Sequence, residues 1–586
     1  IVLAGRPYHL DPQINHGISQ IMTTEGFHVL TEDSIAHMGD VKGLRVVNQW
    51  VYHSRLYAAA RIAAKNPNLE FVQLNSFGCG LDAIDTDQVE EIMAQYNRIY
   101  TCLKIDEGTN MGAIRIRLRS LKAAVEERKH RKILPVKQFD NDEPVNFTKD
   151  MKKEGYTLLM PMMSPIHQHG LVDVALRASG YNVVNLPMDD RKAVDVGQKF
   201  VNNDACYPAI ISIGQMLEAL QSGKYDLKKT AVMMTQTGGG CRATNYIPLI
   251  RKALKDAGFP QVPVVSMSMG NQGVEQTPGF KLTLPLIKRV AIAFLYGDIF
   301  ERVVYRTRPY EMEPGTIDKM HEDWLQLVKP SVEKGSFSEF KKNVAEIVED
   351  FDTVPLRQVS KPKVGLVGEI LVKYSPIANN NIVRLLEREG AEAVVPDIVG
   401  FMNYSLYNQI YKYQEFGASK KAKIFAEMAI KLIKWCEQPM QKALTASKRF
   451  DGITAIEELA DDASKILSLG NQTGEGWFLT GEMIELLNSG VPNIICMQPF
   501  GCLPNHIVGK GMVKELRRQY PGANIAPIDY DPGTSIVNQL NRIRLMLATA
   551  NKKLRQENDH GRQIPRESVG RRESQELLSA VSKLER

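Results

Sequence analysis

Long apolar runs and a strong charge of either sign are both missing from this sequence. No stretch approaches the roughly 20 unbroken apolar residues that a membrane-spanning helix needs, and no signal peptide is visible. Lysine and arginine number 73 against 67 aspartate and glutamate residues, and the net charge of +6 is spread along the chain. Such a balance does not favour nucleic-acid binding. We therefore expect a cytoplasmic protein without a membrane or a nucleic acid as partner.

Cysteine is scarce, with seven residues in 586. An odd number without a secretion signal disfavours a disulfide framework, which leaves metal binding, catalysis or inert burial. The C-x-x-C pairs that structural zinc uses do not occur, and the chain has neither a P-loop nor a G-x-G-x-x-G fingerprint. The sequence therefore predicts no ATP site in this chain.

Strand-like segments alternate with helix-like segments through most of the chain. This alternation predicts an α/β protein with several doubly wound parallel-sheet (flavodoxin-like) domains and a helical connector. The chain opens on strand-like sequence without a methionine, so we expect it to be the downstream part of a longer polypeptide. The predicted divisions are an N-terminally incomplete α/β domain (1–135), a linker (136–155), a second α/β domain (156–275), a helical connector (276–360), a third α/β domain (361–550) and a charged tail (551–586).

Three cysteines lie in loops of the kind where parallel sheets present their sites. Cys206 precedes Pro208, which suits the first turn of a helix, and a helix N-terminus favours a thiolate. Cys241 follows a buried strand and the glycines Gly239 and Gly240, which let the backbone approach a ligand and expose N–H groups. Cys502 follows another predicted strand. We expect the three to share one site past the carboxyl ends of the strands.

Other residues in post-strand loops are weaker candidates. Cys79 lies in the same kind of loop within the first domain, whereas Cys102 and Cys496 lie in strand-like sequence and Cys436 in a helix-like segment, which are typical of core positions. The polar residues that could line the same cleft are Arg242, Glu369, Lys373, Glu475 and His506. His9 and His16 follow the first strand, but satisfied loop histidines are the more common case.

A cysteine hydrolase is the main alternative chemistry at this point. Cys502 and His506 offer a nucleophile and a base. The two residues, however, lie within one short loop, and this reading leaves the matching loops of Cys206 and Cys241 unexplained. A shared metal site accounts for all three loops.

Several motifs resemble the 2-hydroxyacyl-CoA dehydratase family, and more closely the large proteins called acyl-CoA dehydratase activase-related. The resemblance covers nearly all of residues 1–550, although the ATPase domains that precede the dehydratase-like part in such proteins are absent from this sequence. The motifs that carry it are Gly5-Arg6-Pro7-Tyr8-His9, Ser76-Phe77-Gly78-Cys79-Gly80, Lys104-Ile105-Asp106-Glu107-Gly108, Cys206-Tyr207-Pro208, Gly238-Gly239-Gly240-Cys241-Arg242 and Pro499-Phe500-Gly501-Cys502-Leu503-Pro504-Asn505-His506.

The resemblance implies an iron–sulfur cluster, either [4Fe–4S] or the double-cubane [8Fe–9S] form, on Cys206, Cys241 and Cys502. Gly239, Gly240 and Cys79 are the further cofactor-binding candidates, and Cys79, in the first domain, would belong to a second cluster if the full protein holds one. The implied function is a low-potential reductase or 2-hydroxyacyl-CoA dehydratase-like lyase of anaerobic metabolism, with an ATP-dependent activase as electron donor, an acyl-CoA substrate and a homodimeric state. Two alternatives stay open, a double-cubane reductase of small molecules and a non-catalytic electron-transfer or scaffold subunit.

Overall fold

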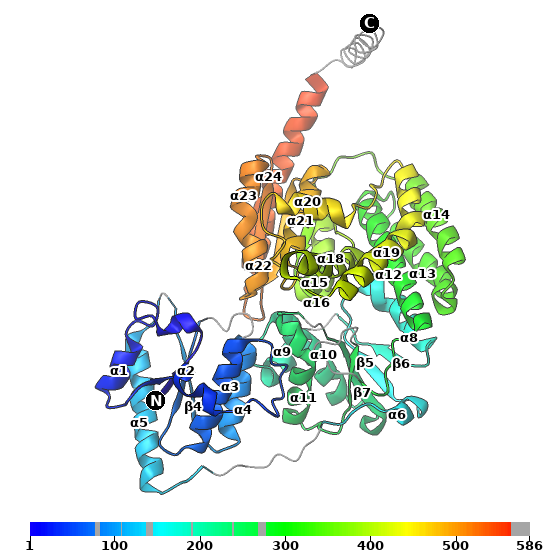
Figure 1. Ribbon diagram of the computed structural model, residues 1–586. Helices are drawn as coiled ribbons and strands as arrows, with labels where there is room; N and C mark the ends of the chain where they lie inside the picture. The colour runs from blue at the N-terminus through cyan, green and yellow to red at the C-terminus, as the bar shows by residue number, and fades with distance from the viewer. Residues whose placement is uncertain are drawn as a thin grey trace.

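The computed structural model describes residues 1–76, 82–106, 108–135, 144–188, 191–236, 239–267 and 277–563, with side chains up to residue 556. Three units follow one another along the chain, and each contains one four-stranded sheet in which every strand pair is parallel. Figure 1 shows the first unit beside the second, with the third unit above the second. The predicted α/β class with doubly wound parallel sheets is confirmed.

The first sheet has the strand order β2-β1-β3-β4. Its strands β1 and β3 are fully buried, as expected for a sheet that helices cover on both faces. Residues 110–127, which show helical periodicity in the sequence, form most of α5. The elements of this unit are β1 (Val2–Ala4), η1 (Pro7–Leu10), α1 (Ile18–Thr24), β2 (Leu30–Thr31), α2 (Glu32–Ile35), η2 (Ala36–Met38), α3 (Val51–Lys65), β3 (Phe71–Asn75), α4 (Asp82–Ala94), β4 (Tyr100–Lys104) and α5 (Met111–His130).

The second sheet repeats this order as β6-β5-β7-β8. Its buried apolar strands pack against α10, whose residues are almost all buried. The elements are α6 (Lys149–Lys153), β5 (Thr157–Met160), α7 (Pro165–His167), η3 (Gln168–Val172), α8 (Asp173–Arg177), β6 (Asn182–Asn185), α9 (Lys192–Phe200), α10 (Tyr207–Gln221), η4 (Leu227–Lys229), β7 (Thr230–Thr235), η5 (Arg242–Asn245), α11 (Tyr246–Asp256) and β8 (Val264–Met267).

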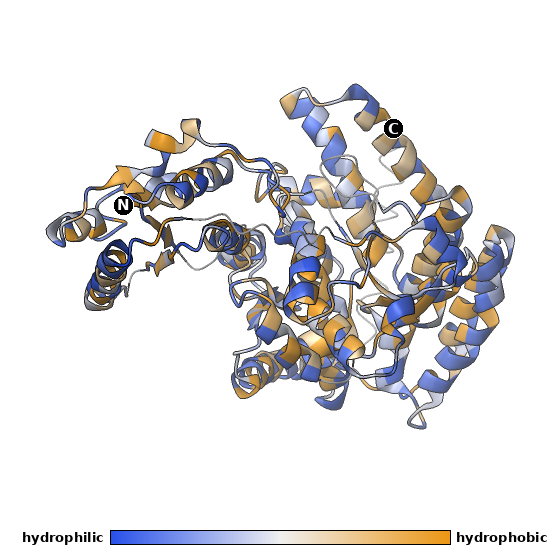
Figure 2. Ribbon diagram, turned by 90° about the horizontal axis from the view of Figure 1, so that it is seen from below, coloured by the Kyte–Doolittle hydropathy of each residue, from blue (hydrophilic) through white to orange (hydrophobic). Residues whose placement is uncertain are grey.

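Helices occupy the chain between the second and third sheets. They are α12 (Leu284–Thr307), η6 (Arg308–Tyr310), α13 (Thr316–Lys334) and α14 (Phe337–Thr353). Helix α12 carries buried apolar side chains such as Ile299 and Phe300, and it belongs to the largest hydrophobic cluster, which continues from the second sheet into the third unit. Figure 2 shows apolar and polar residues side by side on most helices, as expected for helices that bury one face. The helical character predicted for this stretch is confirmed.

The third sheet has the order β10-β9-β11-β12. Long helices between β10 and β11 enlarge this unit, and α24 extends away from the rest of the molecule (Figure 1). The elements are β9 (Lys363–Gly368), α15 (Ile370–Tyr374), α16 (Pro376–Asn379), α17 (Ile382–Arg388), β10 (Glu392–Val394), α18 (Ile398–Phe416), α19 (Lys420–Ala446), α20 (Ile456–Ser464), α21 (Gly476–Asn488), β11 (Asn493–Pro499), α22 (Leu503–Val508), η7 (Lys510–Met512), α23 (Val513–Gln519), β12 (Asn524–Tyr530) and α24 (Ile536–Gln563).

The shared strand order fixes where ligands can bind. The neighbours at the centre of each sheet are the first and third strands of the unit, and connections leave them toward opposite sides. Such a switch point opens a crevice at the carboxyl ends of the strands. Within the described part of the chain, no helix combines the length and the apolar character needed to cross a bilayer.

Candidate functional site

Each of the three candidate cysteines stands directly before a helix. Cys206 is the N-cap residue of α10, Cys241 that of the short helix η5 and Cys502 that of α22. The backbone dipole places positive charge at a helix N-terminus, which favours a thiolate over a thiol. The predicted position of Cys206, with Pro208 in the first helical turn, is confirmed, and the other two cysteines share this setting.

The side chain of Arg242 connects the loops of the three cysteines. Its guanidinium donates hydrogen bonds to the carbonyl oxygens of Asp204 (2.9 Å) and Gly501 (3.1 Å), which belong to the segments just before the first and third cysteines. Arg242 itself follows Cys241, so one buried residue ties together loops of the second and third units. Although burial opposes its charge, the three cysteine thiols hold the pKa of Arg242 above its usual value.

The thiols themselves are poorly exposed. The Sγ atom of Cys206 lies 3.1 Å from the hydroxyl oxygen of Tyr246. Burial, reinforced by the neighbouring Cys206, raises the pKa of Cys241 to about 12. Burial, followed by Glu475 and Cys241, raises the pKa of Cys502 well above its usual value. Thiols in such surroundings ionise only when positive charge is added beside them, as a metal centre would add it.

Two carboxyl groups close the site on the side of the third unit. Glu369 directly follows β9, and its side chain accepts a hydrogen bond from the backbone N–H of Val372 (2.8 Å). Glu475 accepts one from the backbone N–H of Ile370 (3.0 Å). Burial, and then Glu475, raises the pKa of Glu369 to about 8. Because Glu475 acts on the pKa of both Cys241 and Cys502, the structure brings this acidic pair to the cysteines.

Lys373 lies one turn further along α15 and is already paired. Its Nζ atom is 2.8 Å from Oε1 of Glu482, and both side chains are almost completely buried. The structure therefore places this candidate within an internal ion pair of the third unit.

His506 faces away from the reactive atom that a hydrolase would need. Its Nδ1 atom lies 2.9 Å from the carbonyl oxygen of Cys502, and its Nε2 atom lies 3.7 Å from Oδ1 of Asp529. A nucleophile–base pair requires contact between the imidazole and the thiol. The arrangement therefore favours a shared site of three cysteines over a cysteine hydrolase.

The glycine loop before Cys241 is contacted from two sides. A Cβ atom added to Gly240 would lie 3.2 Å from Cζ2 of Trp50 in the first unit and 3.5 Å from Oγ1 of Thr473 in the third. An added Cβ at Gly239 would meet open space. Of these two glycines, only Gly240 has close neighbours on the side where a side chain would stand.

The remaining sequence candidates fall into ordinary positions. Cys102 lies in β4, Cys496 is fully buried in β11, and Cys436 lies in α19 and packs partly against the core. Among the histidines, Nε2 of His9 lies 2.9 Å from Oγ of Ser76, and Nε2 of His16 lies 3.1 Å from the carbonyl oxygen of Asp106. Cys79 lies outside the residues that the structure describes.

Sequence reasoning missed several residues because no motif marks them. Tyr246 contacts Cys206 from the start of α11, and Trp50 reaches Gly240 from the first unit.

Sequence reasoning also missed a group of possible metal-binding side chains in the first unit. Among the described residues, His53, Asp82 and Asp85 are the only set of His, Cys, Asp or Glu side chains whose ligand atoms lie as close together as one metal ion requires. The three cysteines do not meet that single-ion criterion.

The comparisons with known proteins match only the start of the chain. A family model described as "CoA enzyme activase uncharacterised domain" matches residues 1–35. No curated protein matches the sequence. The match relates the first part of the chain, from β1 to the end of α2, to proteins associated with CoA enzyme activases, in line with the resemblance that the motifs suggest.

Proposed function

We propose that this chain is the iron–sulfur component of a low-potential reductase or 2-hydroxyacyl-CoA dehydratase that works with an ATP-dependent activase. Cys206, Cys241 and Cys502 would hold the cluster. The observation that carries the proposal is the convergence of three loops, from two different sheets, on Arg242. Unrelated structural cysteines would not be expected to surround one buried arginine, each at the N-terminus of a helix.

The chemistry of this donor set fits an iron–sulfur cluster. Cysteine thiolates are the usual ligands of such clusters, and hydrogen bonds and nearby charge tune their potential. Arg242 and three helix N-termini supply positive charge around the thiols. Sulfur atoms that are too far apart for a single ion suit a larger cluster, which spreads its ligands over several metal atoms. The cluster would be of the [4Fe–4S] or the double-cubane [8Fe–9S] type.

A bound cluster would supply an electron at low potential and, at an iron that lacks a fourth cysteine, a Lewis-acid position. The residues of the chain would position the ligands and would hold or transfer protons. Arg242 holds the loops in register across the two units. Because its pKa is raised to about 8, Glu369 carries a proton at neutral pH. A protonated carboxyl group is suited to protonate a departing hydroxyl group.

A cavity lies next to the segment that precedes Cys206, although none of the three cysteines lines it. It has a volume of about 550 Å³ and lies between β4 and α5 of the first unit and the segment that precedes Cys206. Asp204 lines the cavity, and its carbonyl oxygen binds Arg242. The charged lining is mixed, with Lys104 and Arg117 against Glu90, Asp106 and Asp204, and Lys104 pairs with Asp204 at 2.7 Å.

The test is the iron and sulfide content of the anaerobically purified protein, together with its EPR spectrum after reduction. We expect a cluster signal that Cys241→Ala abolishes. Cys436→Ala is the matched control, because Cys436 lies in α19 and belongs to no shared group. A reconstituted full-length protein without iron, or an unchanged signal in Cys241→Ala, would contradict the proposal.

A further inference from the structure

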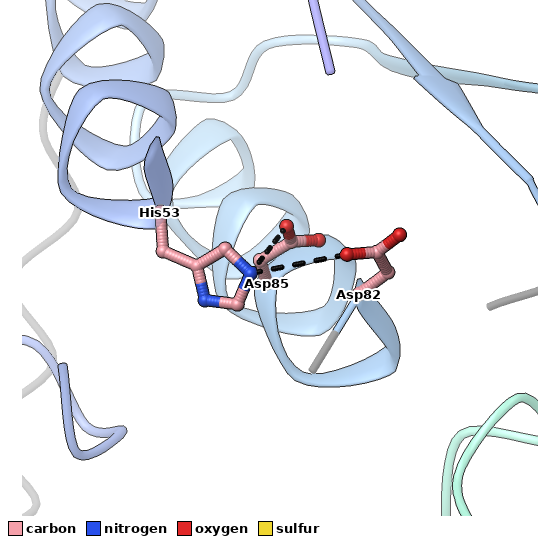
Figure 3. Close-up of side chains that lie close together, drawn as sticks. All are labelled: His53, Asp82 and Asp85. Atoms are coloured by element: carbon pink, nitrogen blue, oxygen red, sulfur yellow. Dashed lines mark ion pairs between the residues drawn. The ribbon is translucent and has the colours of Figure 1, made fainter. Parts of the chain in front are cut away.

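A compact group of metal-binding side chains lies in the first unit, apart from the cysteines. His53 belongs to α3, and Asp82 and Asp85 lie one turn apart at the start of α4 (Figure 3). One ligand atom from each residue lies within 4.8 Å of the other two. Ligands at 2.0–2.2 Å from a single ion are separated by distances of about this size or less.

The two carboxylates are oriented so that each presents one oxygen to the imidazole. Nε2 of His53 lies 3.2 Å from Oδ2 of Asp85 and 3.9 Å from Oδ1 of Asp82. Figure 3 shows the ring nitrogen between the two carboxyl groups. The three atoms therefore surround a common point and leave the other oxygens free for different partners.

Those other oxygens are held from outside the group. Nε of Arg6 donates to Oδ2 of Asp82 (2.7 Å), and Nε2 of Gln73 donates to Oδ1 of Asp85 (3.0 Å). The hydroxyl group of Tyr52 donates to Oδ1 of Asp82 (3.2 Å), the oxygen that also faces His53. Metal sites commonly show this pattern, in which outer hydrogen bonds orient the ligating carboxylates.

Burial makes the arrangement costly without a ligand. His53, Asp82 and Asp85 are only 3%, 4% and 1% exposed. Within the part of the chain that the structure describes, Nε2 of His53 has no hydrogen-bond partner although it is buried. Nε2 therefore faces two carboxylate oxygens without a hydrogen bond of regular geometry to either, an arrangement that suits a ligand shared by all three atoms.

We propose that His53, Asp82 and Asp85 bind one divalent transition-metal ion. Imidazole nitrogen with two carboxylate oxygens suits zinc, iron(II) or manganese(II) better than calcium, which prefers oxygen ligands alone. With both carboxyl groups ionised, Arg6 would offset one of the two negative charges and leave the other for the ion.

The position in the sheet supports the assignment independently of the cysteines. Arg6 follows β1, and Gln73 lies in β3, the two strands that meet at the switch point of the first sheet. The metal group lies beside this crevice, where open α/β sheets place their ligands. The cysteines belong to the second and third units, so either site can exist without the other.

The test uses Mn²⁺ as the probe, because its hardness disfavours thiolates. Full-length protein carrying Cys241→Ala is freed of metal by chelation and titrated, and bound Mn²⁺ is measured by loss of the free-ion EPR signal. We expect one Mn²⁺ per chain, displaced by Zn²⁺. His53→Asn and Asp85→Asn should each weaken binding more than about tenfold. His16→Asn, an exposed histidine of the same unit, is the matched control and should leave binding unchanged.

Two outcomes would overturn the proposal. One is a full-length protein that binds no Mn²⁺ or Zn²⁺ below about 1 mM, an affinity worth only about 4 kcal/mol. The other is folded His53→Asn and Asp85→Asn variants, checked by circular dichroism, that bind Mn²⁺ as the parent does. The first outcome depends on no variant, so the proposal can fail even if both substitutions unfold the protein. Either outcome would mean that His53 and Asp85 form only a buried contact and bind no metal ion.

Discussion

Lys373 and Glu482 form a buried ion pair in the third unit. Their side chains are 4% and 2% exposed, and their charged atoms lie 2.8 Å apart. Burial raises the pKa of Glu482 to about 7, although Lys373 opposes the rise. Two charges so far from water depend on each other, because either one alone would be left uncompensated.

Replacing the lysine should therefore be costly. We expect Lys373→Met to destabilise the protein by about 3–5 kcal/mol, since it leaves a buried carboxylate without its partner. Without the lysine, the pKa of Glu482 in the folded state rises further above its unfolded value. The folded state then loses stability as pH increases, so the gap to wild type should widen above pH 7. Urea unfolding at pH 6 and pH 8 measures both effects.

The double variant Lys373→Met/Glu482→Gln is the matched control. Because it removes both charges, it should recover part of the lost stability and most of the added pH dependence. A Lys373→Met protein as stable as wild type at pH 8 would show that the pair contributes nothing. In that case Lys373 would not be held by Glu482 and could act at the cysteine site.

Some residues of the site could be predicted from the sequence, and others could not. The loops of Cys206, Cys241 and Cys502 were predictable because glycine, proline and strand ends leave local signals. The partner of Lys373 and the contact from Trp50 were not, because they depend on packing between segments far apart in the chain. His53 escaped notice for the same reason, since its carboxylate partners lie on a different helix.

At the scale of elements, one strand order recurs in all three sheets and positions both candidate sites. Glu369 follows β9 and Cys502 follows β11, the two central strands of the third sheet. In the first sheet, Arg6 follows β1 and Gln73 lies within β3, the two central strands. The alternation of strands and helices made the sheets predictable. It gave no signal for the long helices α18 and α19, which enlarge the third unit between β10 and β11.

The packing of α13 on α12 includes a histidine that cannot easily take a proton. His321 meets Phe300 edge-on, with ring centroids 4.9 Å apart. Burial, followed by Arg308, lowers the pKa of His321 from 6.5 to about 4. The unfolded chain binds a proton at this residue in that interval and the folded chain does not, so stability is lost as pH falls from 6.5 toward 4.

We expect His321→Leu to flatten this part of the stability curve. The wild-type protein should lose unfolding free energy between pH 6.5 and pH 4 that the variant keeps. Chemical denaturation at a series of pH values measures the difference. His37→Leu, at an exposed position, should follow the wild-type curve. Parallel curves for His321→Leu and wild type would show that the histidine is protonated equally in both states.

At the scale of the whole molecule, the first unit is tied to the cysteine site by a few polar contacts. Arg45 donates to the carbonyl oxygen of Pro248 (3.1 Å), and the backbone N–H of Val47 donates to Oδ1 of Asn245 (2.8 Å). Lys252 pairs with Asp87 at 3.1 Å. Since Asn245 lies in η5, the helix that Cys241 caps, docking of the first unit and the shape of the cysteine loop are mechanically connected.

Asn245→Ala tests that connection. Asn245 is 1% exposed, so its removal leaves the Val47 N–H without an acceptor at a buried interface, at a cost of about 1–3 kcal/mol. Hydrogen exchange should become faster at residues 45–48 and in η5, while the strands of both sheets stay protected. Lys252→Ala is the control, because Asp87 keeps its ion pair with Arg45 when Lys252 is removed. Faster exchange at 45–48 that leaves η5 unchanged would mean that the first unit docks without affecting the cysteine loop.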